Sequence, residues 1–258
     1  MLLVCTVLFA CSTITLPKID TPPTVASPVK VDSWPEPTAY YQRVKLKNVI
    51  VGLVRTKDGT GTGFPIQRKD GKLRFLTAHH VLYDRNILIF SPETGKSRYE
   101  ERKILNIELF RGGNSLALIK AKDIKRLGGS KDLDTAILEM PVPAIKDMLF
   151  IRLSADKPVV GERIVSFGCY VGIVPSFTGG YVTRQNLYGN NAHYWVSSCP
   201  TYMGGSGGPL INLTTSTIVG VCSAVLKDPP SGQIVTHVQY FVSAADIRKW
   251  LIERGYYE

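Results

Sequence analysis

A serine flanked by two glycine pairs is the feature of this sequence that most suggests chemistry: Gly204-Gly205-Ser206-Gly207-Gly208-Pro209. An apolar run starts directly behind it, as expected for a turn that leads into a strand. Glycines allow positive φ angles and a close approach of the backbone to a ligand. Successive N–H groups in such a loop can also stabilise an oxyanion. Ser206 is therefore a candidate nucleophile, and the alternative is an ordinary turn between two strands.

A serine hydroxyl reacts well only when a neighbouring base takes its proton and a third group orients that base. Two of the four histidines, His79 and His80, end an alternating apolar segment and follow Thr77-Ala78. Asp132 and Asp134 stand just before another apolar segment. A candidate base and a candidate orienting acid thus precede the serine in the chain.

These blocks resemble those of the chymotrypsin-like serine proteases, in particular the trypsin-like group that includes the HtrA-type bacterial enzymes. Residues 77–80 are similar to the family's Thr-Ala-x-His block, residues 134–136 to Asp-x-Ala, and residues 204–209 to Gly-x-Ser-Gly-Gly-Pro. Gly61-Thr62-Gly63-Phe64 also resembles the strand before the histidine in the HtrA-type enzymes. The resemblance covers roughly residues 44–251 and keeps the order histidine, aspartate, serine.

The resemblance implies a serine endopeptidase that hydrolyses peptide bonds through an acyl-enzyme, with no metal and no organic cofactor. His80 would be the general base, Asp134 would orient it and Ser206 would be the nucleophile. The N–H groups of Gly204 and Ser206 would form the oxyanion hole, with Gly205 in the same loop. The partner would be a polypeptide substrate.

Two rivals and one departure accompany that assignment. His79 and Asp132 are the neighbouring alternatives, and the family register favours His80 and Asp134 over them. Gly205 stands where the animal digestive enzymes have an acidic residue that pairs with a newly cut N-terminus, so that mode of activation is not available here. A protease-fold protein that binds peptides without cutting them is the alternative function.

The resemblance also suggests a primary substrate pocket. The family register places Thr201, Ser223, Val225 and His237 there, and it lets Ser223 support the buried aspartate as well. His237 could bind a polar or acidic substrate side chain. Residues 199–201, at the expected pocket base, contain no aspartate, so cleavage after lysine or arginine is disfavoured.

Short β-branched segments separated by glycine and proline turns fill the body of the 258-residue chain, and its 44% apolar content is ordinary for a globular protein. The expected fold is all-β, with two antiparallel six-stranded barrels of the chymotrypsin type and the site between them. Residues 41–145 would form the first barrel. Residues 146–258 would form the second, ending in a C-terminal helix over residues 244–253.

The N-terminus differs in composition from the body. Residues 1–16 predict an apolar leader or anchor, and the proline-rich residues 17–40 predict an extended linker. Export follows as an expectation: a periplasmic, secreted or membrane-tethered protein, with lipidation at Cys11 as one variant. Residues 201–207 also fit the Thr-x-x-Gly-x-Ser-Gly pattern of sobemovirus-like polyproteins, so a viral membrane-associated protease is the alternative. The oligomeric state is left open.

Charge and cysteine content give weaker expectations. The net charge is +10, and basic residues concentrate between Lys120 and Lys131. That segment lacks the interleaved aromatic residues of single-strand binders, so it predicts a solvated loop and argues against a nucleic-acid partner. Three of the five cysteines lie in the body, which permits at most one internal disulfide. Zinc-ligand spacing does not occur, so no metal site is expected.

Overall fold

The computed structural model describes residues 46–91, 96–145, 147–185, 194–227, 231 and 233–258. The expectations for the leader, the linker and Cys11 therefore lie outside the described residues. Among the helices that the structure does describe, none has the length and hydrophobicity that crossing a bilayer requires.

An antiparallel seven-stranded sheet, called the first sheet below, forms the first half of the described body. Its strands, in spatial order, are β7 (Asn114–Lys120), β6 (Ile104–Arg111), β1 (Ile50–Thr56), β2 (Gly59–Lys69), β3 (Lys72–Thr77), β9 (Thr135–Pro141) and β8 (Lys125–Ser130). The β2–β3 turn is made by Asp70 and Gly71, whose φ angles of 50° and 68° are those of a type I′ hairpin turn. The sequence thus sets the register of the two strands that precede the candidate base.

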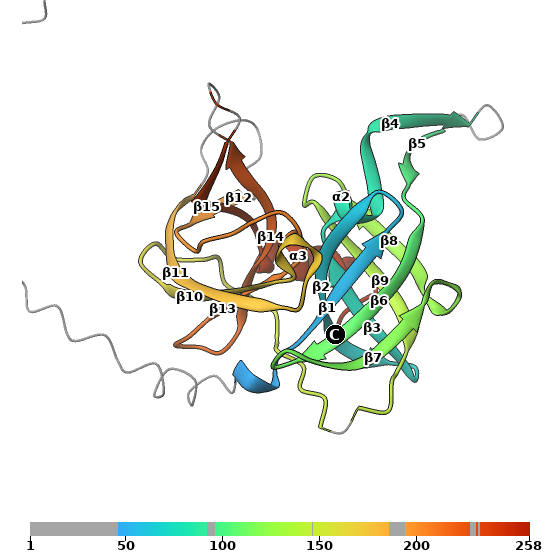
Figure 1. Cartoon of the computed structure of the whole chain (residues 1–258), viewed down its shortest axis with the longest axis horizontal. Helices are drawn as coiled ribbons and strands as arrows, with labels where there is room; N and C mark the ends of the chain where they lie inside the picture. The colour runs from blue at the N-terminus through green and yellow to red at the C-terminus, as the bar shows by residue number, and fades with distance from the viewer. Residues whose placement is uncertain (1–45, 92–95, 146, 186–193, 228–230, 232) are drawn as a thin grey trace, which may run out of the picture. The chain divides into compact units, whose positions relative to one another are not determined.

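Short helical turns and a ribbon connect these strands. Between β3 and β9 the chain forms α2 (His79–Leu82), the ribbon β4 (Tyr83–Ser91) and β5 (Lys96–Glu101), and η2 (Ala121–Asp123). The ribbon pairs only with itself among the described strands, and it extends beyond α2 away from the first sheet (Figure 1). The turn η1 (Leu46–Asn48) precedes β1.

A closed antiparallel barrel forms the second half. Around the barrel the strands are β10 (Arg163–Gly168), β11 (Ser176–Gln185), β12 (Tyr194–Ser197), β15 (Ile234–Ser243), β14 (Ile218–Lys227) and β13 (Pro209–Asn212). The turn η3 (Tyr170–Gly172) follows β10, and α3 (Ala244–Glu253) follows β15 and packs on β14 and β15. Closure pairs every barrel strand on both sides and leaves no exposed edge.

Apolar side chains hold each half together and also join the two halves. Phe75 and Leu138 belong to a core under the first sheet, and Phe241 belongs to one inside the barrel. A further cluster contains Leu53 of β1 together with Val165 of β10, so side chains from both halves share one core. This shared core fixes the relation between residues that the two halves contribute to a common site.

The predicted fold class is confirmed: the described chain is mostly β, with one closed six-stranded barrel, a second sheet and a C-terminal helix. The first half differs in detail from a six-stranded barrel, because β4 and β5 form a separate ribbon and the main sheet has seven strands. The extra strand is β8, which lies in the basic segment expected to be a loop. Its Gly128-Gly129 pair and lysine-rich flanks hide the strand pattern, and pairing with β9 supplies the order instead.

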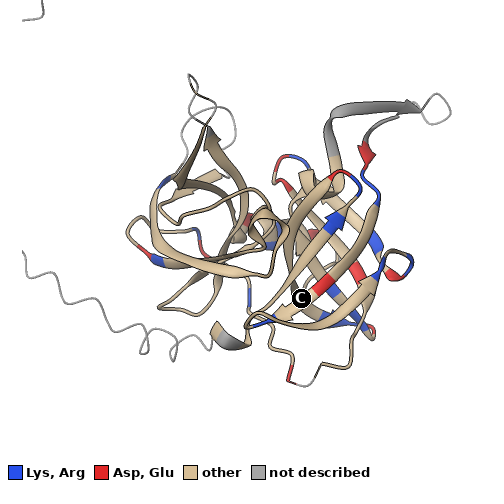
Figure 2. Cartoon of the chain, in the orientation of Figure 1, with Lys and Arg blue, Asp and Glu red and all other residues tan. Residues whose placement is uncertain are grey.

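Charged side chains gather on the first sheet, whereas the barrel carries few in the view of Figure 2. The two signs are interspersed there. Arg74 and Glu139, opposite each other on β3 and β9, are 2.5 Å apart, and Arg55 and Glu108 on β1 and β6 are 3.0 Å apart. Much of the charge on this sheet is therefore paired across strands.

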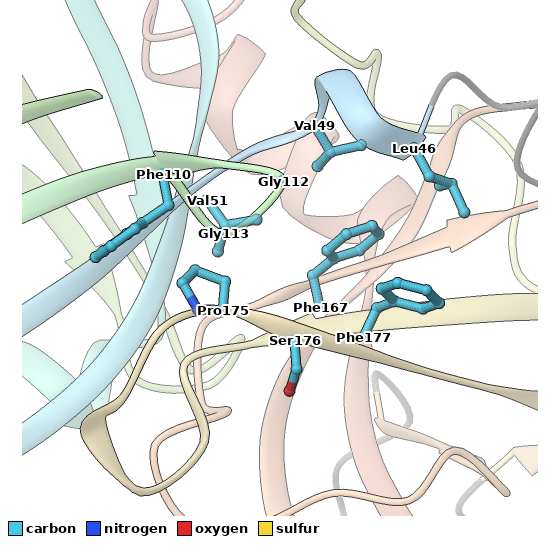
Figure 3. Close-up of a pocket in the computed structure, with 10 residues that line it drawn as sticks. All are labelled: Leu46, Val49, Val51, Phe110, Gly112, Gly113, Phe167, Pro175, Ser176 and Phe177. Carbon is cyan, nitrogen blue, oxygen red and sulfur yellow. The ribbon is translucent and has the colours of Figure 1, made fainter. Parts of the chain in front are cut away.

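An apolar groove of about 420 Å³ lies where η1 and the β6–β7 turn meet the start of β11 (Figure 3). Val49 and Phe110 line one side, and Phe167 and Phe177 line the other. The groove belongs to the edge of the shared core, and its lining does not include His80, Asp134 or Ser206.

Candidate active site

His80 is placed by the single turn of α2, which begins two residues after β3 ends. The turn is held by Asp134: the His79 N–H donates to the Asp134 carbonyl at 3.0 Å, and the His80 N–H donates to Asp134 Oδ1 at 3.1 Å. The backbone of α2 is thus hydrogen-bonded to both the main chain and the carboxylate of Asp134.

The side chains of His80 and Asp134 form a close pair. His80 Nδ1 lies 2.8 Å from Asp134 Oδ2 and 3.1 Å from Oδ1. The carboxylate is 1% exposed and the imidazole 26%, so the acid is buried while the base faces solvent. A carboxylate at Nδ1 favours the tautomer with the proton on that nitrogen, which leaves Nε2 able to accept one.

Asp134 is held in a conformation that few residues adopt easily. Its φ angle is 41°, in the left-handed region that aspartate tolerates better than most residues, and its N–H donates to the Lys131 carbonyl at 3.0 Å. The Ser223 hydroxyl, from β14 in the barrel, makes a short hydrogen bond to Asp134 Oδ2 and lies 3.3 Å from the Tyr194 hydroxyl. A buried carboxylate needs such donors to offset its lost hydration.

The two rivals lie elsewhere. His79 is 6% exposed and stacks on Tyr83 with ring centroids 4.3 Å apart. Asp132 is exposed, two residues before the buried Asp134. Of the two candidate pairs, the structure therefore brings together His80 and Asp134.

Ser206 lies in the loop that precedes β13. Its Oγ donates to the Ser223 carbonyl at 3.3 Å. A cavity of about 680 Å³ is lined by both His80 and Ser206. Asp58, from the β1–β2 turn, and Arg102, from the start of the segment into β6, line it too, although no motif marked them. The cavity therefore spans residues from both halves of the body.

The loop around Ser206 is shaped by backbone hydrogen bonds. Gly204 and Gly207 have φ angles of 93° and 88°, which only glycine adopts readily. The Gly205 N–H donates to the Tyr202 carbonyl at 3.1 Å, so it is engaged inside the loop. Among the backbone hydrogen bonds between described residues, none uses the N–H of Gly204 or Ser206.

Thr62, on β2, ties the nucleophile loop to the first sheet. Its Oγ1 donates to the Gly204 carbonyl at 2.6 Å and accepts from the Cys169 N–H at 2.8 Å. Its backbone N–H donates to the Ser206 carbonyl at 2.8 Å. The motif Gly-Thr-Gly-Phe marked this strand, but the role of Thr62 follows only from the folded contacts.

The suggested substrate-pocket residues separate in the structure. Ser223 and Val225 line the cavity. Thr201 is buried at 3% exposed, beneath the cavity lining, whereas His237 is exposed near the tip of the β14–β15 hairpin. The β14–β15 register instead places Gln239 opposite Val225. His237 does not line this cavity, and its role in binding a substrate side chain stays a prediction.

Gln239 is fully buried and connects four elements. Its Nε2 lies 2.9 Å from Ser166 Oγ, 3.2 Å from Thr201 Oγ1 and 3.1 Å from Cys222 Sγ. Its Oε1 accepts from Ser197 Oγ at 3.0 Å. The sequence offers one signal for it, a polar residue on the apolar face of a strand.

The three body cysteines are free and buried, so the single internal disulfide that the count allowed is absent from the described residues. Burial raises the pKa of Cys169 and of Cys199 to about 12, and that of Cys222 to about 11. At neutral pH these thiols are protonated and packed as apolar groups.

Comparison with known proteins agrees with this geometry. No curated protein matches the chain in sequence. Among solved structures, the active form of the Rv3671c protease from M. tuberculosis has a TM-score of 0.59 at 18% identity, covering 94% of this chain and 95% of the other. The HtrA-type protease AlgW with a tripeptide has a TM-score of 0.58 at 18% identity, covering 86% and 65%. A serine endoprotease from Yersinia pestis has a TM-score of 0.58 at 15% identity, covering 84% and 65%.

These structures share the fold, and the chain spans about two thirds of the length of the last two. The family model for the trypsin-like peptidase domain matches residues 61–221, which include His80, Asp134 and Ser206. The chain belongs to the family of trypsin-like peptidase domains.

Proposed function

We propose that this protein is a serine endopeptidase in which Ser206 attacks the substrate, His80 is the general base and Asp134 orients His80. The observation that carries the proposal is the 2.8 Å contact from His80 Nδ1 to the buried Asp134 Oδ2, in a residue that lines one cavity with Ser206. Ordinary surface histidines do not combine these features.

The reaction would proceed in two halves. His80 Nε2 takes the proton from Ser206 Oγ as the oxygen bonds to the scissile carbonyl carbon, and the N–H groups of Gly204 and Ser206 stabilise the oxyanion. The carbon–nitrogen bond then breaks, and His80 gives its proton to the leaving amine. Water next attacks the acyl carbon, and His80 takes a proton from it. The bond from that carbon to Ser206 Oγ then breaks, His80 returns the proton to Ser206 Oγ, and the carboxylic acid product leaves.

The lining of the cavity favours cleavage after uncharged side chains. At its barrel end the lining includes Cys222, Ser223, Ala224 and Val225, which carry no formal charge at neutral pH. Val225 narrows that end relative to a glycine. The tripeptide named with AlgW supports a polypeptide as the substrate class of this fold.

The test is proteolysis of casein by the purified full chain and by Ser206→Ala. We expect Ser206→Ala to lose cleavage almost entirely, by about 10⁶-fold in kcat, because losing a triad nucleophile removes covalent catalysis. Ser115→Ala, an exposed serine of β7, is the matched control and should cleave as the wild type does. Equal activity of Ser206→Ala and wild type would overturn the assignment. A folded wild type that binds casein peptides without cutting them would instead support the non-cleaving peptide-binding function.

A further inference from the structure

The segment Cys169–Gly172, at the end of β10 and through η3, packs directly on the loop that carries Ser206. A Cβ placed on Gly204 would lie 2.4 Å from the Cys169 carbonyl oxygen and 3.1 Å from the Val171 nitrogen. The two segments therefore touch backbone to backbone, and only glycine fits at position 204 both for space and for its φ angle of 93°.

One hydrogen bond in this contact determines the direction of a peptide group. The Val171 N–H donates to the Met203 carbonyl at 2.7 Å. In a trans peptide the carbonyl and the N–H of the next residue point in opposite directions. Holding the Met203 carbonyl on Val171 therefore turns the Gly204 N–H away from η3, and this is one of the two donors that the proposed mechanism uses.

The Tyr170 ring packs against the loop that carries Ser206. It lies between two glycines: a Cβ on Gly168 would be 2.6 Å from its Cε1, and a Cβ on Gly205 would be 2.7 Å from the same atom. The ring therefore occupies the space into which any side chain at position 205 would project. Gly205 is the position at which the digestive enzymes of the family carry their acidic residue, and in this chain an aromatic ring fills that volume.

The ring matters more than the hydroxyl in this environment. Burial raises the pKa of Tyr170 to about 12, so the side chain stays neutral, with Ser166 and Thr178 offsetting part of that rise. The hydroxyl oxygen is buried without a hydrogen bond of good geometry to any described residue. Removal of the hydroxyl should therefore cost little, whereas removal of the ring empties the space under Gly205.

Val171, in η3, has a strained backbone conformation. Its φ and ψ angles are 49° and 27°, a left-handed conformation that is costly for a β-branched residue, and its side chain is 63% exposed. The side chain gains little from burial that would offset this cost. The conformation is instead fixed by the bond to Met203 and by the Gly172 N–H, which donates to the Cys169 carbonyl at 3.1 Å.

We propose that Tyr170 is a positioning residue: its ring and the turn that follows it hold the Met203–Gly205 backbone with the Gly204 N–H directed at the substrate oxyanion. This inference rests on the proposed peptidase function. The Tyr170 ring then gives the loop the support that, in the digestive enzymes, comes from the acidic residue paired with a newly cut N-terminus. The site is therefore competent without cleavage of the chain.

The experiment compares Tyr170→Phe and Tyr170→Ala in the full chain, with a peptide substrate taken from a casein site that the wild type cleaves. Tyr170→Phe should keep kcat within about 2-fold, because it retains the ring and loses only the hydroxyl. Tyr170→Ala should lower kcat by about 10- to 100-fold with little change in KM, somewhat less than deletion of an oxyanion donor. Equal losses in both variants, or full activity of Tyr170→Ala, would overturn the proposal.

A second readout separates positioning from general loss of structure. A peptide aldehyde forms a hemiacetal with Ser206 whose oxygen needs the oxyanion donors, whereas the matching peptide amide does not. In Tyr170→Ala the aldehyde affinity should fall in parallel with kcat, and the amide affinity should stay within about 3-fold. Tyr257→Ala, which truncates another buried tyrosine, should lower the melting temperature without changing the ratio of the two affinities. A parallel fall in both affinities would contradict a role in positioning.

Gly205→Ala gives a variant in case Tyr170→Ala fails to fold. Its added methyl group would collide with the ring, and it should lower kcat, whereas the pair Gly205→Ala with Tyr170→Ala should recover part of the loss. If the effects of the two substitutions on kcat were strictly additive, the collision with the ring would not be the cause of the loss in Gly205→Ala. A wild type that cleaves no peptide would contradict the peptidase function itself. An active wild type with an equally active Tyr170→Ala variant would contradict only the role proposed for Tyr170.

Discussion

The two halves of the body hold their reactive groups in different ways. In the first half, the imidazole and the backbone N–H of His80 both contact the Asp134 carboxylate. In the barrel, Ser206 sits in a loop whose shape depends on glycine conformations and backbone hydrogen bonds to Thr62 and η3. The contact between His80 and Asp134 thus depends on side-chain chemistry, and the loop that carries Ser206 depends on backbone geometry.

This difference predicts different responses to mutation. Loss of the carboxylate that contacts His80 should abolish catalysis and leave the fold intact. Loss of a hydrogen bond around the loop should instead lower activity and stability together, because the same bond shapes the loop and joins the two halves.

The largest effect should come from the carboxylate. Asp134→Asn should lower kcat by about 10⁴-fold, as the amide favours the wrong imidazole tautomer in triads of this kind. Steady-state kinetics on a cleaved peptide would measure it. Asp132→Asn, at the exposed neighbouring position, is the matched control and should keep wild-type kcat. A greater loss in Asp132→Asn would reassign the orienting acid.

An intermediate effect should follow from Thr62→Val. This nearly isosteric change removes the hydroxyl between the Gly204 carbonyl and the Cys169 N–H, so it leaves a buried donor and acceptor unpaired. We expect kcat to fall by roughly 10-fold and the free energy of unfolding to fall by about 1–3 kcal/mol. Kinetics and urea denaturation measure the two quantities. The exposed Thr215→Val should change neither, and an active, fully stable Thr62→Val would break the comparison.

Gln239→Leu should mainly affect stability. It removes the amide that pairs with Ser166, Thr201 and Ser197 in the barrel, and it should cost about 1–3 kcal/mol in the free energy of unfolding. The urea midpoint would report this loss, with the exposed Gln233→Leu as control. A midpoint at or above that of the wild type would show that the buried network adds no net stability.

The last prediction concerns the buried thiols and stability at alkaline pH. Their folded pKa values of about 11 to 12 exceed the value of about 8.5 in an unfolded chain, so the folded state retains protons that the unfolded state has lost. Stability should therefore fall as pH rises from about 9 to 11, by on the order of 1 kcal/mol per pH unit for each thiol. Melting curves across that range test it. Cys222→Ala should flatten the slope, and an unchanged slope would exclude this thiol as a contributor.

The sequence predicted the parts of the site that depend on local pattern. Histidine, aspartate and serine each stand in a short motif, and the register of the family's Thr-Ala-x-His block favoured His80 over His79. Strand alternation and the Asp70-Gly71 turn likewise predicted β2 and β3. Such features depend on neighbours within a few residues, which a sequence displays directly.

The parts that were missed depend on contacts between distant segments. The buried amide of Gln239 is held by Ser166 and Thr201, which come from other parts of the chain. β8 forms in a basic glycine-containing segment because β9 supplies its hydrogen bonds. Thr62 and Tyr170 act on a loop more than thirty residues away, and no local pattern marks such a contact.

Reaction of the full chain with a fluorophosphonate, followed by peptide mapping in a mass spectrometer, tests the central claim most directly. An activated serine in such a site becomes phosphonylated, whereas ordinary serines do not react. We predict a single adduct on Ser206, which forms far more slowly in Asp134→Asn. A folded protein that gains no adduct, or one that is modified on a different serine, would contradict the assignment of Ser206, His80 and Asp134 as a catalytic triad.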